Sequence, residues 1–461
     1  DLIYPNIDSD PYTSDLNAQV QETLDEVFGQ ENYDIGHLFA YASAGGNGNA
    51  GTVGSVCQNG VKGSAFSAHP FQGNTDDPFL NDHFDIDYVT HEMGHQFGAF
   101  HTFSHKNEFE GFSTEPGSGS TIMGYAGVVG LDNVQRHSDP YFHYYSIQNI
   151  NEYTDERTCY TSVLNENQIP AVTADRDYTI PIGTAYELDA SGTDPDGDVL
   201  YYCWEQLDEG QVDASNFGPH NHLGAQARSL SPSLSSIRTI PKMDAVLEGG
   251  LTLKNPKTGG RWETVSLVDR LLTWAVTVRD RFPAAANFSG RTAFDIKTIK
   301  VISDAGPFQI TSQNQDGIVW EAGSKQSLFW EVAQTNKPPI NTKFVSVFLS
   351  TDGGKTFEKP LLISTPNDGK EIITVPGGIS SKQVRIKIVP DNSIYFTVNS
   401  HDIEITPAPF VLAFPSYAEE ACNNEVSFSF DFETFSNLDQ KVSLNFSNLP
   451  SGILAQFSKS Q

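Results

Sequence analysis

The segment from His91 to His101 constrains this chain most, because it joins a metal-binding pattern to an obligatory turn. Its sequence is His-Glu-Met-Gly-His-Gln-Phe-Gly-Ala-Phe-His, which has the form HExxHxxGxxH. His91 and His95 are four residues apart, so a helix places both imidazoles on one face. Gly98 permits a turn with positive φ, which would end the helix and return the chain toward His101.

This spacing predicts a catalytic metal centre. Nitrogen atoms from His91, His95 and His101 suit Zn²⁺ and leave a fourth position open to water, as in catalytic rather than structural zinc sites. Glu92 follows the first ligand and is the expected general base that takes a proton from this water. The alternative is that these histidines are only satisfied core residues of an amphipathic helix.

A methionine segment downstream points to a known group of enzymes. The sequence Gly-Ser-Thr-Ile-Met-Gly-Tyr at 119–125 contains Met123, one of only three methionines in the chain. A long histidine motif followed by such a methionine turn resembles the metzincin metallopeptidases. The resemblance implies that Met123 forms an apolar floor under the zinc ligands, a packing role that suits an adaptable thioether.

Within the metzincins, the chain is most similar to the reprolysin-like (adamalysin-like) branch in its bacterial secreted form. It differs from animal reprolysins at Thr102, where those enzymes have aspartate, and its methionine turn lacks their cysteine. Tyr125 resembles the tyrosine of astacins and serralysins that reaches the zinc and the oxyanion, so it is a candidate catalytic residue. The alternative for Tyr125 is a packed ring whose hydroxyl bonds a backbone group. Another metzincin branch, such as the pappalysins, is a further interpretation.

The composition limits the choice of partners. The chain has 461 residues, enough for three or four domains, and 28 Lys and Arg against 58 Asp and Glu give a net charge of −30. A surface this negative repels phosphate backbones and argues against nucleic acid as a partner. The sequence contains no run of eighteen apolar residues, so no membrane-spanning helix is expected.

The four cysteines predict one disulfide. Cys57 and Cys159 bracket the peptidase region, and a bond between them would fit an oxidising compartment outside the cytoplasm. Two buried thiols are the alternative. Cys203 and Cys422 lie in different predicted modules and are not expected to pair. We therefore expect a secreted or cell-surface protein.

Residues 1–167 are the predicted catalytic domain, of α/β (α+β) class. Known metzincin domains have a further strand and helix before the point at which Asp1 stands, so the resemblance implies a domain truncated at its N-terminus. It also implies an edge strand near Thr52–Val56 that pairs with extended substrate. The other expected elements are a strand at Leu2–Tyr4, a helix capped by Ser14 and running to Phe28, a strand at Tyr33–Phe39, an active helix capped by Asp87, and a helix at Tyr141–Tyr153.

From about residue 168 the pattern changes to an alternation of period two, which is typical of β-strands. The alternating apolar positions are Leu272, Trp274, Val276 and Val278, then Val384, Ile386 and Ile388, and finally Val426, Phe428, Phe430 and Phe432. These runs predict all-β sandwich domains in series, at 168–303, 304–408 and, as a partial module, 409–461. The stretch from about 205 to 260 is poorly patterned and is interpreted as an insertion.

The first of these modules resembles a polycystic-kidney-disease (PKD) or cadherin-like domain, and residues 304–408 resemble an immunoglobulin-like one. The PKD resemblance rests on Asp194-Pro195-Asp196-Gly197-Asp198 and on the later Val278-Arg279-Asp280. Alternating aspartates offer hard oxygen ligands, so Asp194, Asp196 and Asp198 are candidate ligands for Ca²⁺. An exposed acidic turn is the alternative.

Together these features predict a secreted zinc-dependent endopeptidase that cleaves protein or peptide substrates by Glu92-assisted attack of water. The alternative is an adhesive or carbohydrate-binding surface protein with an inactive peptidase-like domain, whose β modules contact a cell surface or a polysaccharide. Glu92 favours the peptidase, because a zinc site that only binds has no use for this carboxylate.

Overall fold

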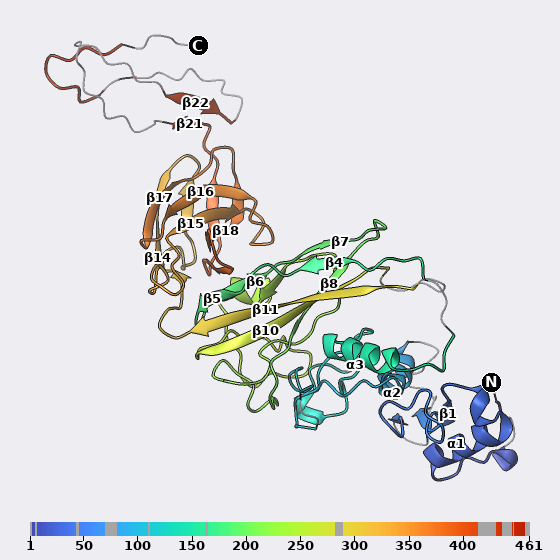
Figure 1. Cartoon of the computed structure of the whole chain (residues 1–461). Coiled ribbons are helices and arrows are strands. Elements are labelled where there is room, and N and C mark those ends of the chain that lie inside the picture. Colours follow the sequence, from blue (N-terminus) through green and yellow to red (C-terminus); the bar gives the residue numbers. More distant parts are fainter. Residues whose placement is uncertain are drawn as a thin grey trace.

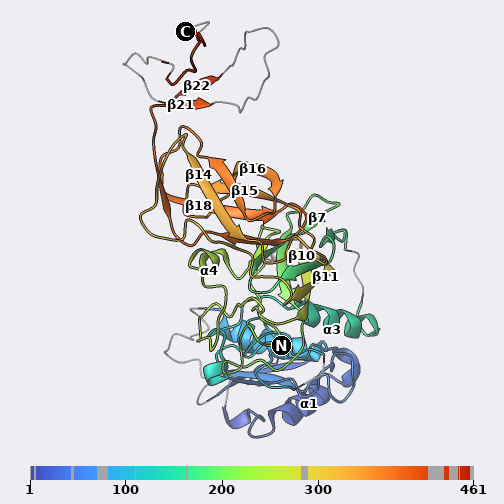
Figure 2. The ribbon, with the colours of Figure 1, turned by 90° about the vertical axis from the view of Figure 1, so that its left-hand side faces the viewer.

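The computed structural model describes residues 2–4, 7–42, 46–69, 81–108, 111–161, 165–281, 289–413, 430–435, 445 and 447–456. The chain is elongated, with the helix-containing N-terminal region at one end and the last described strands, Phe410–Ala413 and Asp431–Thr434, at the other, as two views show (Figure 1, Figure 2). Among the described helices, none has the length and apolar character needed to cross a membrane.

The N-terminal region combines a small mixed sheet with three helices. Its strand order is β1–β3–β2, with β1 parallel and β2 antiparallel to the central β3. The strands are β1 (His37–Tyr41), β2 (Asn47–Asn49) and β3 (Ala65–His69), and the helices are α1 (Leu16–Val27), α2 (His91–Gln96) and α3 (Tyr144–Asp155). The mixed α and β composition expected for this region is therefore present.

Several local predictions need correction. The segment Leu2–Tyr4 is irregular backbone and not a strand. Asp15, rather than Ser14, caps α1, because its carboxylate accepts a hydrogen bond from the Ala18 N–H at 3.2 Å. The strand expected at Tyr33–Phe39 and the helix expected at Tyr141–Tyr153 both exist, but β1 and α3 begin a few residues later.

The active helix does not begin at Asp87. A π-helical segment, Asp85–Thr90, runs directly into α2. The Asp87 carboxylate turns to another part of the chain, where it contacts His137 Nδ1 at 2.8 Å and accepts from the Ser138 N–H at 2.8 Å. These tertiary partners outcompete the capping role that local spacing predicts.

The edge strand lies at β2 and not at Thr52–Val56. The N–H groups of Gly54 and Ser55 are bonded to the carbonyls of His95 and Gln96, at 2.8 and 2.9 Å. Thr52–Val56 thus forms turns that satisfy the C-terminal carbonyls of α2, which have no partner within the helix.

The rest of the described chain is mainly strands. The middle region contains β4 (Ala171–Thr173), β5 (Tyr178–Pro181), β6 (Ala185–Leu188), β7 (Ser191–Thr193), β8 (Tyr201–Gln206), β9 (Arg238–Ile240), α4 (Met243–Leu247), β10 (Arg270–Arg279) and β11 (Thr292–Ile302). The next contains β12 (Gln309–Ile310), β13 (Val319–Glu321), β14 (Lys325–Glu331), β15 (Phe344–Ser350), β16 (Lys359–Pro366), β17 (Lys370–Thr374), β18 (Ser381–Pro390), β19 (Tyr395–Val398) and β20 (Ile403–Thr406). The last described pair is β21 (Phe410–Ala413) and β22 (Asp431–Thr434).

The predicted apolar positions are buried in the long strands, although β10 is buried on its opposite face too, where Ala275 and Thr277 are at most 2% exposed. On β10, the side chains of Leu272, Trp274, Val276 and Val278 are at most 2% exposed, and on β18 those of Val384, Ile386 and Ile388 are fully buried. In the third run, Phe432 lies in β22 and Phe430 precedes it, whereas Val426 and Phe428 lie outside the described residues.

Strand pairing crosses the module boundary predicted near residue 304. β6 pairs antiparallel with β19, and one hydrophobic core joins residues of the middle region to residues of the next. Lys387 Nζ also contacts Glu187 Oε2 at 2.6 Å. These two regions therefore share a sheet and a core, and the exact module limits stay predictions.

Candidate metal centre

The structure brings the three predicted ligands together. His91 and His95 project from α2, and the chain then turns so that His101 Nε2 lies 3.2 Å from His91 Nε2 and 2.9 Å from His95 Nε2. The turn begins at Gly98, whose φ of +93° is the positive value that the sequence predicted. A Cβ at this position would also lie 2.7 Å from Tyr153 Cβ, so glycine is required on two counts.

The second nitrogen of each ring faces an acceptor. His91 Nδ1 bonds the Ile122 carbonyl at 2.7 Å, His95 Nδ1 bonds the Ala99 carbonyl at 2.8 Å, and His101 Nδ1 contacts the Glu108 carboxylate. These acceptors place the ring hydrogen on Nδ1 and leave a lone pair on every Nε2. Burial lowers the pKa of all three imidazoles, with neighbouring histidines adding to the effect at His91 and His101, so the rings are neutral.

The donor set fits Zn²⁺. Three Nε2 lone pairs that face one another at these distances repel unless a cation lies between them. Three neutral imidazoles are the ligand set of many catalytic zinc sites, and outer partners such as Ile122 O, Ala99 O and Glu108 fix the orientation of the rings.

Met123 packs against the active helix, and its role as a floor under the ligands stays a prediction. Its side chain is fully buried and packs with Ala99 and Ile122. A Cβ added to Gly94, which lies on α2 between the two helix ligands, would be 2.5 Å from Met123 Sδ. The thioether therefore lies against the helix backbone at Gly94.

Glu92 lies between the active helix and the edge strand. Its side chain is 8% exposed, and burial raises its pKa to about 8 against the opposing effect of a hydrogen bond from the Ala50 backbone. A Cβ added to Gly48 on β2 would lie 2.5 Å from Glu92 Oε1. The edge strand thus passes against the carboxylate, and glycine makes room for it.

Tyr125 packs beside the histidine cluster. Its ring centroid lies 4.5 Å from that of His101 and 5.7 Å from that of His91. Burial, with Glu108 and Glu92 nearby, raises the pKa of Tyr125 to about 12, so the hydroxyl keeps its proton. Among the described residues, no hydrogen bond contributes to this shift, and both the catalytic role of Tyr125 and its alternative stay predictions.

The predicted disulfide is present. Cys57 and Cys159 are bonded, with their Cα atoms 5.7 Å apart. Cys203 is a free, buried thiol, and Cys422 lies outside the described residues.

The aspartate cluster of the middle region makes hydrogen bonds within the chain, although Asp194 Oδ2 has no partner among the described residues. Carboxylate oxygens of Asp194, Asp196 and Asp198 lie within 4.8 Å of one another. Asp194 accepts from the N–H groups of Asp196 and Asp198, Asp196 accepts from Gln168, and Asp198 pairs with Arg281 at 2.7 Å. These bonds stabilise the turn, and the calcium site stays a prediction.

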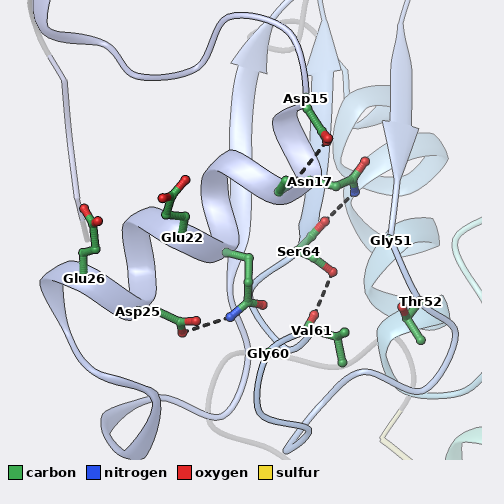
Figure 3. A pocket seen from close by; sticks show the side chains of 12 residues that line it. Asp15, Asn17, Glu22, Asp25, Glu26, Gly51, Thr52, Gly60, Val61 and Ser64 are labelled. Atoms are coloured by element: carbon green, nitrogen blue, oxygen red, sulfur yellow. Dashed lines mark hydrogen bonds between the residues drawn. The ribbon is translucent and has the colours of Figure 1, made fainter.

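A pocket beside α1 is lined by none of the predicted metal ligands or catalytic residues (Figure 3). Its acidic lining has structural uses, since Asp15 caps α1 and Asp25 accepts from Gln21 and Tyr33. The pocket therefore does not compete with the histidine cluster as the candidate site.

Three converging imidazoles, with a buried glutamate on the helix that carries two of them, are the arrangement of a zinc hydrolase. Residues 1–153 match the metallo-peptidase family M12B, reprolysin-like. This match supports a reprolysin-like metallopeptidase domain in this part of the chain, with zinc as its metal and a protein or peptide as its substrate.

The other comparisons add little. No curated protein matches the chain. Among solved structures, a chimeric titin Z1Z2 functionalized with a KLER exogenous peptide from decorin is 10% identical over 53% of this chain and 100% of its own, with a TM-score of 0.16. The insect immune protein hemolin is 10% identical over 53% of this chain and 49% of its own, with a TM-score of 0.15. Scores this low carry no argument about function.

The sequence did not reveal several residues around the ligands. Glu108, the partner of His101, and Glu115, a buried carboxylate near the methionine turn, have no motif that marks them. Gly48 and Ala50, which lie against Glu92, come just before the segment at Thr52–Val56 that was predicted as the edge strand.

Proposed function

We propose that this chain is a secreted zinc-dependent endopeptidase in which Glu92 is the general base. The observation that carries the proposal is the convergence of three Nε2 lone pairs beside a buried carboxylate at an open sheet edge. The family match over residues 1–153 supports the same class of reaction. The disulfide supports export, because such bonds persist in oxidising compartments.

The edge strand supports binding of extended substrate. β2 is an outer strand of its sheet, and it passes directly against Glu92. A peptide that adds to this edge by main-chain hydrogen bonds would lie across the carboxylate. We therefore assign substrate alignment to β2 instead of to Thr52–Val56.

The residues of this chain would divide the chemistry as follows. Zn²⁺, when bound by His91, His95 and His101, supplies Lewis acidity to water and to the scissile carbonyl. Glu92 takes a proton from the attacking water and delivers it to the leaving amine. The Tyr125 hydroxyl donates to the carbonyl oxygen as negative charge develops on it.

Replacement of the general base tests the proposal. We expect Glu92→Gln to retain zinc and to lose hydrolysis by about 10²- to 10⁴-fold, the usual contribution of general acid–base catalysis. Casein or peptide-library cleavage by the full chain, with and without a chelator, measures this loss. Glu22→Gln, an exposed glutamate of α1, is the matched control and should retain full activity.

Two results would contradict the proposal. A fully active Glu92→Gln protein would remove Glu92 from the mechanism. A zinc-loaded wild type that cleaves no peptide would favour the alternative, an adhesive or carbohydrate-binding protein with an inactive peptidase-like domain.

A further inference from the structure

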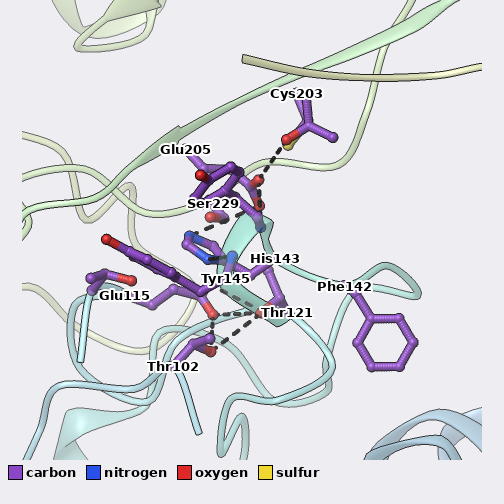
Figure 4. Close-up of polar contacts among 12 residues, drawn as sticks. Thr102, Glu115, Thr121, Phe142, His143, Tyr145, Cys203, Glu205 and Ser229 are labelled. Atoms are coloured by element: carbon purple, nitrogen blue, oxygen red, sulfur yellow. Dashed lines mark hydrogen bonds and ion pairs between the residues drawn. The ribbon is translucent and has the colours of Figure 1, made fainter. Parts of the chain in front are cut away.

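Glu115 is a buried carboxylate that neither the histidine motif nor the proposed chemistry uses. Its side chain is 1% exposed, and it lies between the segment that carries His101 and the methionine turn (Figure 4). Burial of a charge is costly unless hydrogen bonds replace its water, so a carboxylate in this position needs a reason.

The carboxylate bonds both neighbouring segments at once. Oε2 accepts from the hydroxyls of Thr102 and Thr121, at 2.6 and 2.5 Å. Oε1 accepts from the Ser120 N–H at 3.0 Å and from the Ser120 hydroxyl and the Thr121 N–H at 3.3 Å each. All of these donors are neutral, so the charge is stabilised by hydrogen bonds alone.

The bonded residues are next to groups that orient the imidazoles. Thr102 follows His101, and its N–H donates to the Met123 carbonyl at 3.2 Å while its carbonyl accepts from the Glu115 N–H at 2.8 Å. Thr121 precedes Ile122, whose carbonyl accepts from His91 Nδ1 at 2.7 Å. A single carboxylate is therefore connected to the first ligand through Ile122 and to the third through Thr102.

We propose that Glu115 is the positioning residue of the metal centre, which holds the His101 segment and the methionine turn in register so that His91 and His101 converge. The inference rests on the proposed function for the identity of the metal. Glu115 touches neither metal nor substrate, and it acts through Thr102 and Thr121.

Zn²⁺ affinity of the full chain, measured by competition with a chromogenic chelator, tests this role without reference to activity. We expect Glu115→Gln to weaken Zn²⁺ binding about ten-fold, within the range for residues that orient metal ligands. The amide nitrogen cannot accept from the threonine hydroxyls. The visible spectrum of the Co²⁺-substituted variant should also change, because the ligand geometry changes.

Asp280→Asn is the matched control. Asp280 is 2% exposed and accepts from Asn167 Nδ2 at 2.9 Å and from the Arg291 N–H at 2.5 Å, outside the catalytic region. This variant also loses a buried charge, but its Zn²⁺ affinity and Co²⁺ spectrum should match those of the wild type. Equal affinities for Glu115→Gln and Asp280→Asn would overturn the inference.

A second pair of variants decides the matter if Glu115→Gln does not fold. Thr102→Val removes the bonded hydroxyl and should weaken Zn²⁺ binding, whereas Thr102→Ser keeps the hydroxyl and should retain it. Equal affinities in this pair would also overturn the inference. A wild-type protein that binds Zn²⁺ but cleaves no peptide would contradict the proposed function. The Zn²⁺ affinities of the Glu115 and Thr102 variants would still decide whether Glu115 positions the metal ligands.

Discussion

Gly94 lies where the active helix meets the methionine floor. Its Cα faces Met123, and any larger residue would meet the sulfur at 2.5 Å and Phe142 Cε1 at 3.1 Å. Because the interior is close-packed, the added methyl group would move either the helix or the methionine turn. The absence of a side chain at Gly94 therefore determines how closely the helix that carries His91 and His95 packs against Met123.

We predict that Gly94→Ala lowers the free energy of unfolding by about 1 to 3 kcal/mol, the usual cost of overpacking, and weakens zinc binding. Denaturant unfolding and metal competition measure the two effects. Gly218→Ala is the control, because a Cβ there makes only an ordinary contact of 3.4 Å with Lys254. If Gly94→Ala and Gly218→Ala changed the free energy of unfolding and the zinc affinity equally, close packing of Met123 against the helix would not matter for either quantity.

Removal of the Tyr125 hydroxyl tests whether this group donates a hydrogen bond to the substrate carbonyl oxygen. We expect Tyr125→Phe to lower kcat by about 10² to 10³, the usual cost of removing one donor to a developing oxyanion, with zinc affinity unchanged. Steady-state cleavage of a peptide substrate measures this change. Tyr160→Phe, at a ring that is 52% exposed, should have no effect. An unchanged kcat in Tyr125→Phe would leave the tyrosine with a packing role only.

At the level of elements, α3 is joined to the turns that follow β2. The Tyr153 hydroxyl donates to the carbonyls of Gly54 and Val56 at 2.6 and 2.7 Å, and the Cys57–Cys159 disulfide closes the same connection beyond the end of the helix. Those turns also bond the C-terminus of α2. The disulfide therefore stabilises the scaffold behind the metal centre without contacting a ligand.

We predict that the double variant Cys57→Ser/Cys159→Ser loses about 4 kcal/mol of unfolding free energy, because the bond joins residues 102 positions apart and restricts the unfolded chain. Urea unfolding with and without reductant measures the loss. Reductant should destabilise the wild type and leave the double variant unchanged. A wild type unaffected by reductant would contradict the prediction.

At the level of the whole molecule, the segment between β8 and β10 is part of the catalytic scaffold. The Val212 N–H donates to the Ser104 carbonyl, and the Val212 carbonyl accepts from the Gly117 N–H, both at 2.8 Å. Val134 of the N-terminal region packs in one buried cluster with residues of this segment, namely Val212, Phe217 and Trp262. The region interpreted as an insertion thus completes the core behind the methionine turn.

The same segment also reaches the following β region. The Leu247 carbonyl at the end of α4 accepts from Arg385 Nη1 at 3.1 Å, and Leu247 packs where a Cβ on Gly354 would stand. Figure 2 shows α4 between the N-terminal region and the strands of that region. The N-terminal, middle and following regions are therefore joined by shared buried clusters.

We predict that Trp262→Ala weakens zinc binding although Trp262 lies far from the motif in sequence. It should cost about 3 to 5 kcal/mol of stability, as is usual for buried tryptophan. Trp320→Ala is the matched control, because Trp320 is 3% exposed in the core of the β regions and its loss should leave zinc affinity unchanged. Equal zinc affinities of Trp262→Ala and Trp320→Ala would show that the segment between β8 and β10 does not support the metal centre.

The ligand set and the long strands could be predicted because their signals are local. The spacing of His91, His95 and Gly98 acts within two helical turns, and the alternation of Leu272, Trp274 and Val276 follows from the geometry of a single strand. The edge strand and the role of Asp87 could not be predicted in this way. Each depends on a partner distant in sequence, namely β3 for the strand and Ser138 for the carboxylate.

What the sequence determined by itself is the chemistry available to this protein: three imidazoles, one carboxylate and one thioether at spacings that a helix and a turn convert into a site. Only the tertiary structure decided what holds them: the Ile122 carbonyl and Glu108 contact ligand imidazoles, and Glu115 bonds Thr102 beside His101, through contacts that no local pattern encodes. The physical reason is that a helix determines the direction of side chains within a few residues, whereas hydrogen bonds to a buried group depend on how distant segments pack.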